Sequence, residues 1–169
     1  MSVLDDLLKK AQQVKVGLQS DLVRGVLMGH TEDILDCQRE QLLQGKASSG
    51  EDIRPFYSED LKPSGYFSSS EAAGRYSAWK ETLTYPSYKG GRNPDAPNLF
   101  ITGKFHDELG VFYDSDSVAI TGATGYANRI IQKYGISTFG LMQEYWNDVF
   151  YEKGALGELI NNIRQVFNE

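Results

Sequence analysis

The stretch that decides the fold is NLFITGKFHDELGVFYDSDSVAITGATGYANRIIQKYG, residues 98–135. Two short segments within it, Gly110–Asp114 and Ser117–Thr121, have the two-residue repeat of β-strands. Val111 and Tyr113 in the first segment, and Val118 and Ile120 in the second, alternate with polar or solvent-facing residues. The DSDS sequence between them suits a turn, because Asp and Ser side chains bond readily to local backbone. The stretch therefore predicts an antiparallel hairpin.

Short helices are expected on both sides of this hairpin. Thr102 is a candidate cap for a brief helix over Lys104–Leu109, in which His106 is expected at the surface. After the hairpin, apolar residues at helical spacing predict a helix over Tyr126–Tyr134. Gly135 follows as its expected C-terminal stop. The hairpin is thus predicted to pack between helices.

The first 45 residues carry a helical pattern. Leucines recur at helical spacing from Leu4 onward, and Gly45 is the expected end of the helical region. Gly17 and Gly25 weaken the pattern, so we expect one break between helices. These residues are predicted to form a helical arm.

Residues 46–97 are rich in proline, glycine and serine, which predicts loops. Ile53–Tyr57 is a candidate for a short edge strand. One helix is expected over Ser70–Leu83, capped by Ser70, with Tyr76 and Trp79 on its apolar face. Pro86–Pro97 is predicted to be a second polar loop.

Two further amphipathic helices, Leu141–Tyr151 and Ala155–Phe167, are expected on either side of Gly154. The whole chain, residues 1–169, then forms a single α+β domain: a small antiparallel β-sheet packed with helices, a helical N-terminal arm and a helical C-terminus. Its three parts are the arm (1–45), a loop-rich region with one helix (46–97), and a core of β-hairpin and helices (98–169).

Composition narrows the function classes. The net charge is -6, and no cluster of Lys and Arg is visible, so we expect neither specific nucleic-acid binding nor attraction to an anionic membrane. No apolar run approaches the length of a membrane span, and the N-terminus lacks the pattern of a signal peptide. The single cysteine, Cys37, is expected to be a small buried or interfacial residue in a reducing cytoplasm. The ten tyrosines suit either protein interfaces or a tyrosine-rich core.

One alternative is an enzyme. Ile120–Tyr126 (ITGATGY) follows a strand and opens a helix, which is the context of a dinucleotide-binding turn. In addition, Tyr76 and Lys80 have the Tyr-x-x-x-Lys spacing of short-chain dehydrogenases, which use NADP. The third glycine of the fingerprint, however, would fall at Asn128, where a side chain obstructs close packing of helix on strand. Residues 136–169 show helical patterns and no further strand, and the glycine turn follows the Tyr/Lys pair instead of preceding it.

Other candidate sites have weaker patterns. Asp114 and Asp116 lie in the predicted hairpin turn, where solvent exposure explains them better than a metal ion. His30 and His106 lack the spacing of zinc ligands. We therefore predict no catalytic residues, no cofactor and no metal site.

A set of short motifs remains in residues 98–135. An apolar segment ends in Thr102-Gly103 and is followed by an amphipathic turn and then by the hairpin. Tyr126-Ala127 then opens a helix that ends in Tyr134-Gly135. In this order and spacing the motifs resemble the tail-completion or virion-morphogenesis proteins of tailed bacteriophages, which lie in the neck between the head connector and the tail tube.

The resemblance implies a structural protein without chemistry, located in the virion and in the host cytoplasm during assembly. Its expected partners are neighbouring copies of itself in a ring and other neck, portal or tail proteins. A stopper, a terminator and an adaptor role all remain open, as does a cytoplasmic protein-interaction module outside any virion. Six positions are expected to define the fold and not a ligand site: Thr102, Gly103, Tyr126, Ala127, Tyr134 and Gly135.

Overall fold

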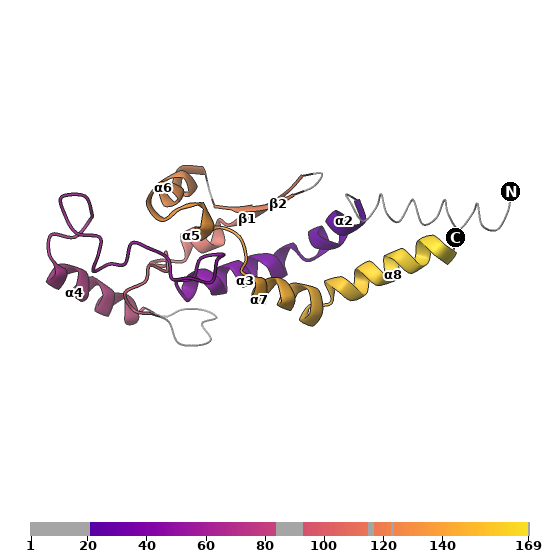
Figure 1. Cartoon of the computed structure of the whole chain (residues 1–169), viewed down its shortest axis with the longest axis horizontal. Coiled ribbons are helices and arrows are strands. Elements are labelled where there is room, and N and C mark those ends of the chain that lie inside the picture. Colours follow the sequence, from indigo (N-terminus) through magenta and orange to yellow (C-terminus); the bar gives the residue numbers. More distant parts are fainter. Residues whose placement is uncertain (1–20, 84–92, 115–116, 123, 169) are drawn as a thin grey trace.

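The structure is a computed structural model that describes residues 21–83, 93–114, 117–122 and 124–168. The leucine pattern before residue 21, Gly17, most of the Pro86–Pro97 loop and the middle of the DSDS turn lie outside the described residues. The described helices and strands form an elongated body (Figure 1). It is an α+β fold with one small antiparallel sheet, which confirms the predicted class.

The chain passes through its elements in a simple order. Helices α2 (Asp21–Gly29) and α3 (Thr31–Leu43) follow one another through the middle of the body, and α4 (Ser70–Glu81) lies at one end (Figure 1). The later elements are α5 (Lys104–Asp107), β1 (Gly110–Tyr113), β2 (Val118–Thr121), α6 (Thr124–Tyr134), the 3-10 turn η1 (Ile136–Thr138), α7 (Gln143–Asn147), a π-helical turn η2 (Asp148–Glu152) and α8 (Ala155–Asn168).

The predicted hairpin is confirmed, with each strand one residue shorter than expected. Val111 pairs with Ile120, which is buried in the core, and Phe112 pairs with Ala119 on the exposed face. This alternation follows from the two-residue repeat of a strand. The Asp114 N–H donates to the carbonyl of Ser117 at 2.9 Å and closes the described part of the turn.

The break and the stop in the N-terminal helical region are also found. The break lies at His30, between α2 and α3, whereas Gly25 sits inside α2. Gly45 follows α3 with φ +72°, a backbone conformation that glycine adopts without steric cost. The expected edge strand at Ile53–Tyr57 is wrong. Ile53 is instead a core residue in an irregular segment, where its N–H donates to the carbonyl of Gly45.

Helix α4 begins where expected, but its cap and its buried face differ from the prediction. The cap is Ser69, one residue earlier than predicted, and its Oγ accepts a hydrogen bond from the Ala72 N–H at 3.2 Å. The helix buries Ala73 and Lys80, while Trp79 is exposed. Helical periodicity alone assigned the wrong face because Lys80 is charged, although its aliphatic stem can line an apolar site.

The C-terminal pair of helices also departs from the expected bounds. The predicted helix Leu141–Tyr151 begins at Gln143 and widens into the π-helical turn over its second half. Gly154 then separates it from α8 with φ +91°, as the sequence predicts for a helix boundary.

Helix α3 lies between two large apolar clusters. One cluster joins α2, α3, β2 and the C-terminal helices through buried residues: Val26, Leu27, Ile34, Cys37, Ile120, Leu141, Val149 and Ala155. The other joins α3 to the loop-rich region, to α6 and to the segment after α5: Leu35, Leu42, Ala47, Ile53, Leu109, Ala127 and Phe139. The described part of the expected arm therefore supplies core residues on two sides.

Two buried glutamines attach α3 to the segment between η1 and α7. The Gln38 side chain accepts from the N–H of Gly140 at 2.8 Å and donates to the carbonyl of Thr138 at 3.4 Å. The Gln41 side chain donates to the carbonyl of Gly140 at 2.9 Å and accepts from the N–H of Met142 at 2.8 Å. Both glutamine side chains are fully buried, and the backbone groups that they bind belong to buried or half-buried residues, so these four bonds satisfy polar groups of both partners.

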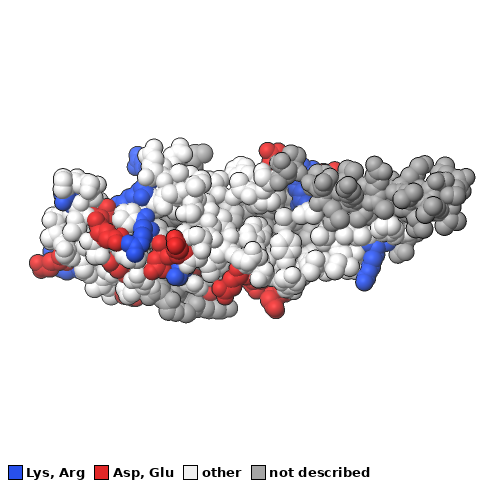
Figure 2. All heavy atoms as spheres, in the orientation of Figure 1, with Lys and Arg blue, Asp and Glu red and all other residues white. Residues whose placement is uncertain are grey.

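The surface mixes charges of both signs. On the face shown in Figure 2, Lys and Arg lie next to Asp and Glu, mostly on the end that contains α4. Lys46 pairs with Asp52 at 2.7 Å, and Arg54 pairs with Glu59. Much of the positive charge of the described residues is therefore neutralised locally.

We predict that Gln38→Met and Gln41→Met each lower the free energy of unfolding by about 1–3 kcal/mol, because each leaves two buried or half-buried backbone groups without their partner. Gln143→Met on the exposed face of α7 is the control and should change stability by less than about 0.5 kcal/mol. Urea denaturation of the three variants measures the difference. Equal effects at all three positions would show that the buried amides do not fix this segment.

A second prediction concerns the two glycines of the ITGATGY turn. A Cβ on Gly122 would lie 2.6 Å from the Phe105 ring, whereas a Cβ on Gly125 would meet nothing within 4 Å. Gly122→Ala should therefore destabilise the protein by about 1–3 kcal/mol through overpacking. Gly125→Ala, within α6, should be neutral or stabilising by up to about 1 kcal/mol. Thermal unfolding compares them, and a larger loss at Gly125 would contradict the packing role of Gly122.

Candidate functional site

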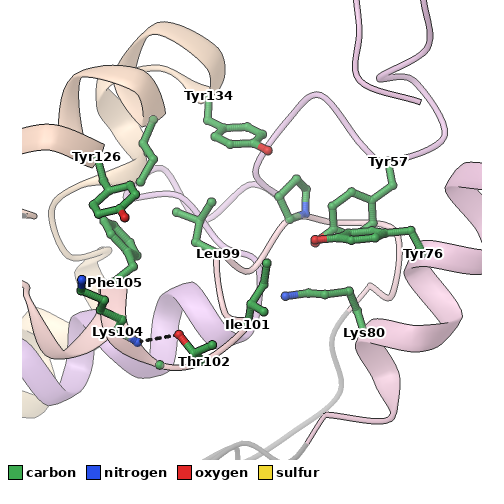
Figure 3. Close-up of a pocket in the computed structure, with 13 residues that line it drawn as sticks. Tyr57, Tyr76, Lys80, Leu99, Ile101, Thr102, Lys104, Phe105, Tyr126 and Tyr134 are labelled. Carbon is green, nitrogen blue, oxygen red and sulfur yellow. Dashed lines mark hydrogen bonds between the residues drawn. The ribbon is translucent and has the colours of Figure 1, made fainter. Parts of the chain in front are cut away.

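A half-open cavity of about 480 Å³, called the tyrosine-rich cavity below, lies between α4, α6 and the segment that leads into α5 (Figure 3). Its lining is mainly aromatic and aliphatic: Tyr57, Tyr76, Tyr126, Tyr134, Phe105, Pro97, Leu99, Ile101 and Ile130, together with Lys80, Lys104, Thr102 and Gly103. A concave apolar site with a few polar groups is the usual form of a binding site.

Helices α4 and α6 contribute side chains to opposite sides of this cavity. Tyr76 and Lys80 are four residues apart on α4 and therefore share a face. Tyr126, Ile130 and Tyr134 have the same spacing on α6. In Figure 3 the α4 side chains and the α6 side chains point toward one another across the cavity.

Between these helices the cavity is lined by a segment in which two residues have a positive φ. Leu99 has φ +56° and Gly103 has φ +86°. The Asn98 side chain supports the turn by accepting from the Phe100 N–H at 3.2 Å. A left-handed conformation at leucine costs roughly 1–2 kcal/mol, and such strain persists only where the surrounding structure enforces it.

An aromatic cluster forms the wall next to α4. The rings of Tyr57 and Tyr76 pack edge to face with centroids 5.1 Å apart, and Phe67 lies 5.2 Å from Tyr76. Tyr76 also lies 5.4 Å from Trp79. These contacts hold the tyrosines of the loop-rich region in fixed positions at the cavity wall.

The lining contains two lysines and no carboxylate among the described residues. Lys80 is only 1% exposed, whereas Lys104 extends to the exposed rim and lies 3.7 Å from Glu108. Burial raises the pKa of the Tyr134 phenol to about 12, with smaller contributions from Asp60 and Tyr76. The described lining of the cavity is thus mainly apolar, and its two charged side chains are both lysines.

The structure brings four of the six motif residues to this cavity. Thr102, Gly103, Tyr126 and Tyr134 line it, and Tyr126 is 49% exposed at the rim. Ala127 is buried in the apolar cluster beneath α6. Gly135 ends α6 with φ +90°, and Gly103 precedes α5 with a positive φ, so both glycines have the backbone role expected from the sequence. Sequence reasoning did not foresee that the motif encloses a cavity.

The structure brings only one half of the enzyme alternative into the described lining of the cavity. Tyr76 and Lys80 line the cavity, but Gly122 and Gly125 are not among its described lining residues. Gly122 packs on Phe105, and Gly125 lies in the first turn of α6. The two described strands pair antiparallel, whereas a dinucleotide crevice forms at the end of a parallel sheet.

A second cavity of about 700 Å³ lies on the other side of Thr102 and Gly103, next to α3. It contains Cys37, which is buried as predicted. Burial raises the pKa of the Cys37 thiol to about 12, and the neighbouring Asp148 adds to the shift. A thiol with this pKa stays protonated near neutral pH and is a poor nucleophile.

His106 also lines this second cavity, and its predicted surface position is wrong. It is 4% exposed and packs between the rings of Phe100 and Phe105. Neither ring nitrogen makes a hydrogen bond of ordinary geometry with any described residue. Burial, with smaller contributions from the positive charges of Lys80 and Arg39, lowers the pKa of His106 to about 4.

The described part of the chain contains no group of three or more His, Cys, Asp or Glu side chains placed to hold a metal ion. None of the described helices has the length and apolar character needed to cross a bilayer.

Comparisons with known proteins found no match for this chain among protein-family models, curated proteins or solved structures.

The burial of His106 predicts how stability depends on pH. The folded-state pKa of about 4 lies below the unfolded value of 6.5, so the unfolded chain binds more protons between these pH values. Stability should therefore fall by about 3 kcal/mol as pH drops from 6.5 to 4. His106→Phe keeps an aromatic ring at this position and should remove most of that dependence. Denaturant titrations at several pH values measure it, and an unchanged slope in the variant would contradict the assignment.

Proposed function

We propose that the chain is a structural component of a tailed-bacteriophage neck, where it helps to complete the tail or join it to the head and assembles as a ring. The observation that carries the proposal is the convergence of the motif residues. Thr102, Gly103, Tyr126 and Tyr134 are spread over residues 102–134, yet they line one cavity beside α4. The motif residues thus line a surface cavity in addition to their expected role in the fold.

The character of that surface supports an assembly role. Large apolar side chains are exposed on the part of the chain that carries the motif: Ile101, Phe112, Tyr126 and Ile136. Ile101 and Tyr126 also belong to the tyrosine-rich cavity. Aromatic residues around a concave apolar site are typical of protein interfaces, where a few buried anchors supply most of the binding energy.

Charge is compatible with a ring through which DNA passes. The net charge is -6, and many basic side chains pair with carboxylates on the same subunit. A subunit without a basic stripe does not bind the phosphate backbone tightly. In this proposal the protein locates to the virion, and to the host cytoplasm during assembly.

The enzyme alternative retains one supporting observation, because Tyr76 and Lys80 do line the same cavity. Two observations favour the structural role: Gly122 and Gly125 are not among the described residues that line the cavity, and the described strands pair antiparallel. A cytoplasmic interaction module would use the same surface but would not enter particles.

The test is to disrupt the gene in the phage that encodes the chain and to examine lysates by electron microscopy. We predict filled heads and separate tails that do not join, and recovery of complete particles when the wild-type gene is supplied on a plasmid. Infectious particles at wild-type yield without the gene would contradict the neck role. Antibody against the purified chain should label the head–tail junction of intact virions. Intact virions that do not contain the chain would instead favour the cytoplasmic interaction module.

A further inference from the structure

His30 lies at the junction between α2 and α3, and two carboxylates from different helices face its ring. Its Nδ1 lies 2.8 Å from Oδ2 of Asp33 in the first turn of α3. Its Nε2 lies 3.4 Å from Oε2 of Glu158 in the first turn of α8. The His30 side chain is 13% exposed, so water and salt screen these contacts less than those of a fully exposed ion pair. His30 therefore links α8 to the junction of α2 and α3.

Other polar groups reach the same junction. Lys153, which precedes α8, lies 3.9 Å from Oδ1 of Asp33, so this carboxylate has Lys153 on one oxygen and His30 on the other. The phenol of Tyr113 on β1 donates to the carbonyl of Leu27 at 2.8 Å. Among lysine, tyrosine, carboxylate and imidazole side chains, the imidazole is the one that ordinarily changes charge between about pH 5 and 8.

The two carboxylate contacts place different requirements on the protons of the His30 ring. A neutral imidazole carries one N–H and one lone pair, whereas the charged ring carries an N–H on each nitrogen. With a carboxylate against each nitrogen, a neutral ring must direct its lone pair at one carboxylate oxygen, which is repulsive. The charged ring attracts both Asp33 and Glu158. The observed arrangement therefore suits the doubly protonated ring.

We propose that protonation of His30 attaches the first turn of α8 to the junction of α2 and α3, and that loss of this proton releases Glu158. The neutral ring keeps the contact with Asp33, because it is the shorter contact and joins residues three apart. The contact with Glu158 joins distant segments and is lost. The attachment therefore weakens as pH rises from about 5 to 8, and it does not depend on the proposed neck role.

Apolar packing holds α8 on both sides of this transition. Helices α2 and α8 lie side by side (Figure 1). Ala155 is fully buried at the start of α8, and Leu159 packs against the apolar cluster that α2 and α3 share. The charge on His30 therefore changes how often the start of α8 detaches locally, while α8 itself stays folded.

The test is a double-mutant cycle on the full chain with His30→Gln, Glu158→Gln and the double variant, measured by urea denaturation at pH 5.5 and pH 8.5. The coupling between the two positions should lower the equilibrium constant for unfolding by about two- to five-fold at pH 5.5 and vanish at pH 8.5. His106 is present in all variants, so its titration cancels within each cycle. Equal coupling at both pH values, or no coupling at pH 5.5, would overturn the proposal.

A cycle on Asp21 and Arg24 is the matched control. These residues form an ion pair at 3.0 Å on α2, and neither a carboxylate nor an arginine ordinarily changes charge between pH 5.5 and 8.5. Their coupling should be the same at both pH values. A control coupling that falls as much as the coupling of His30 with Glu158 would assign the pH effect to the whole protein and overturn the proposal.

Hydrogen exchange measures the local detachment of α8 directly. The protection factors of amides 158–162, corrected for the intrinsic effect of pH, should fall about two- to five-fold from pH 5.5 to 8.5 relative to amides inside α3. Glu158 is half exposed, so Glu158→Gln should leave the fold intact and remove this fall. A fall of the same size in Glu158→Gln would contradict the attachment through His30.

Discussion

The structure depends on the attachment of helix α3 to the backbone between η1 and α7. Gln38 and Gln41 make this attachment with four hydrogen bonds to residues 138–142, and both side chains are fully buried. Since an unmet backbone group in the interior costs about 1–3 kcal/mol, the amides fix where this segment lies. This segment connects α6 and η1 to the C-terminal helices. Fixing it on α3 therefore fixes the relative positions of the two apolar clusters that pack against α3.

The attachment of this segment to α3 also determines where the tyrosine-rich cavity lies. Ala127 and Phe139 belong to the cluster under α3, so the buried face of α6 is held there while Tyr126 and Tyr134 face the cavity. The opposite wall comes from the aromatic cluster of Tyr57, Phe67 and Tyr76, which is a separate apolar unit. The site therefore lies where two parts of the fold meet, which is a common location for binding surfaces.

Sequence patterns correctly predicted the features that depend mainly on neighbouring residues. The two-residue repeat in Gly110–Thr121 predicted the hairpin, and glycines 45, 135 and 154 have the positive φ expected of residues at helix boundaries. The errors arose where tertiary packing decides. Lys80 and His106 carry polar groups that predict exposure, yet both are buried, and His106 packs between the rings of Phe100 and Phe105. Ile53–Tyr57 has the residue types of a strand, but no neighbouring strand is available to it among the described residues. The motif residues were recognisable, whereas the cavity that they share requires α4 from another region.

We propose that this chain is an assembling structural subunit and not a nucleotide-dependent enzyme. Native mass spectrometry of the purified full chain, with and without NADP, distinguishes the two. A structural subunit of this kind is expected to form a closed oligomer of defined mass without a nucleotide adduct. A single chain carrying one NADP, with the adduct lost in Gly125→Val, would contradict it. That variant is the appropriate control because position 125 has space for a side chain, whereas a side chain at Gly122 would collide with Phe105 whether or not a nucleotide binds.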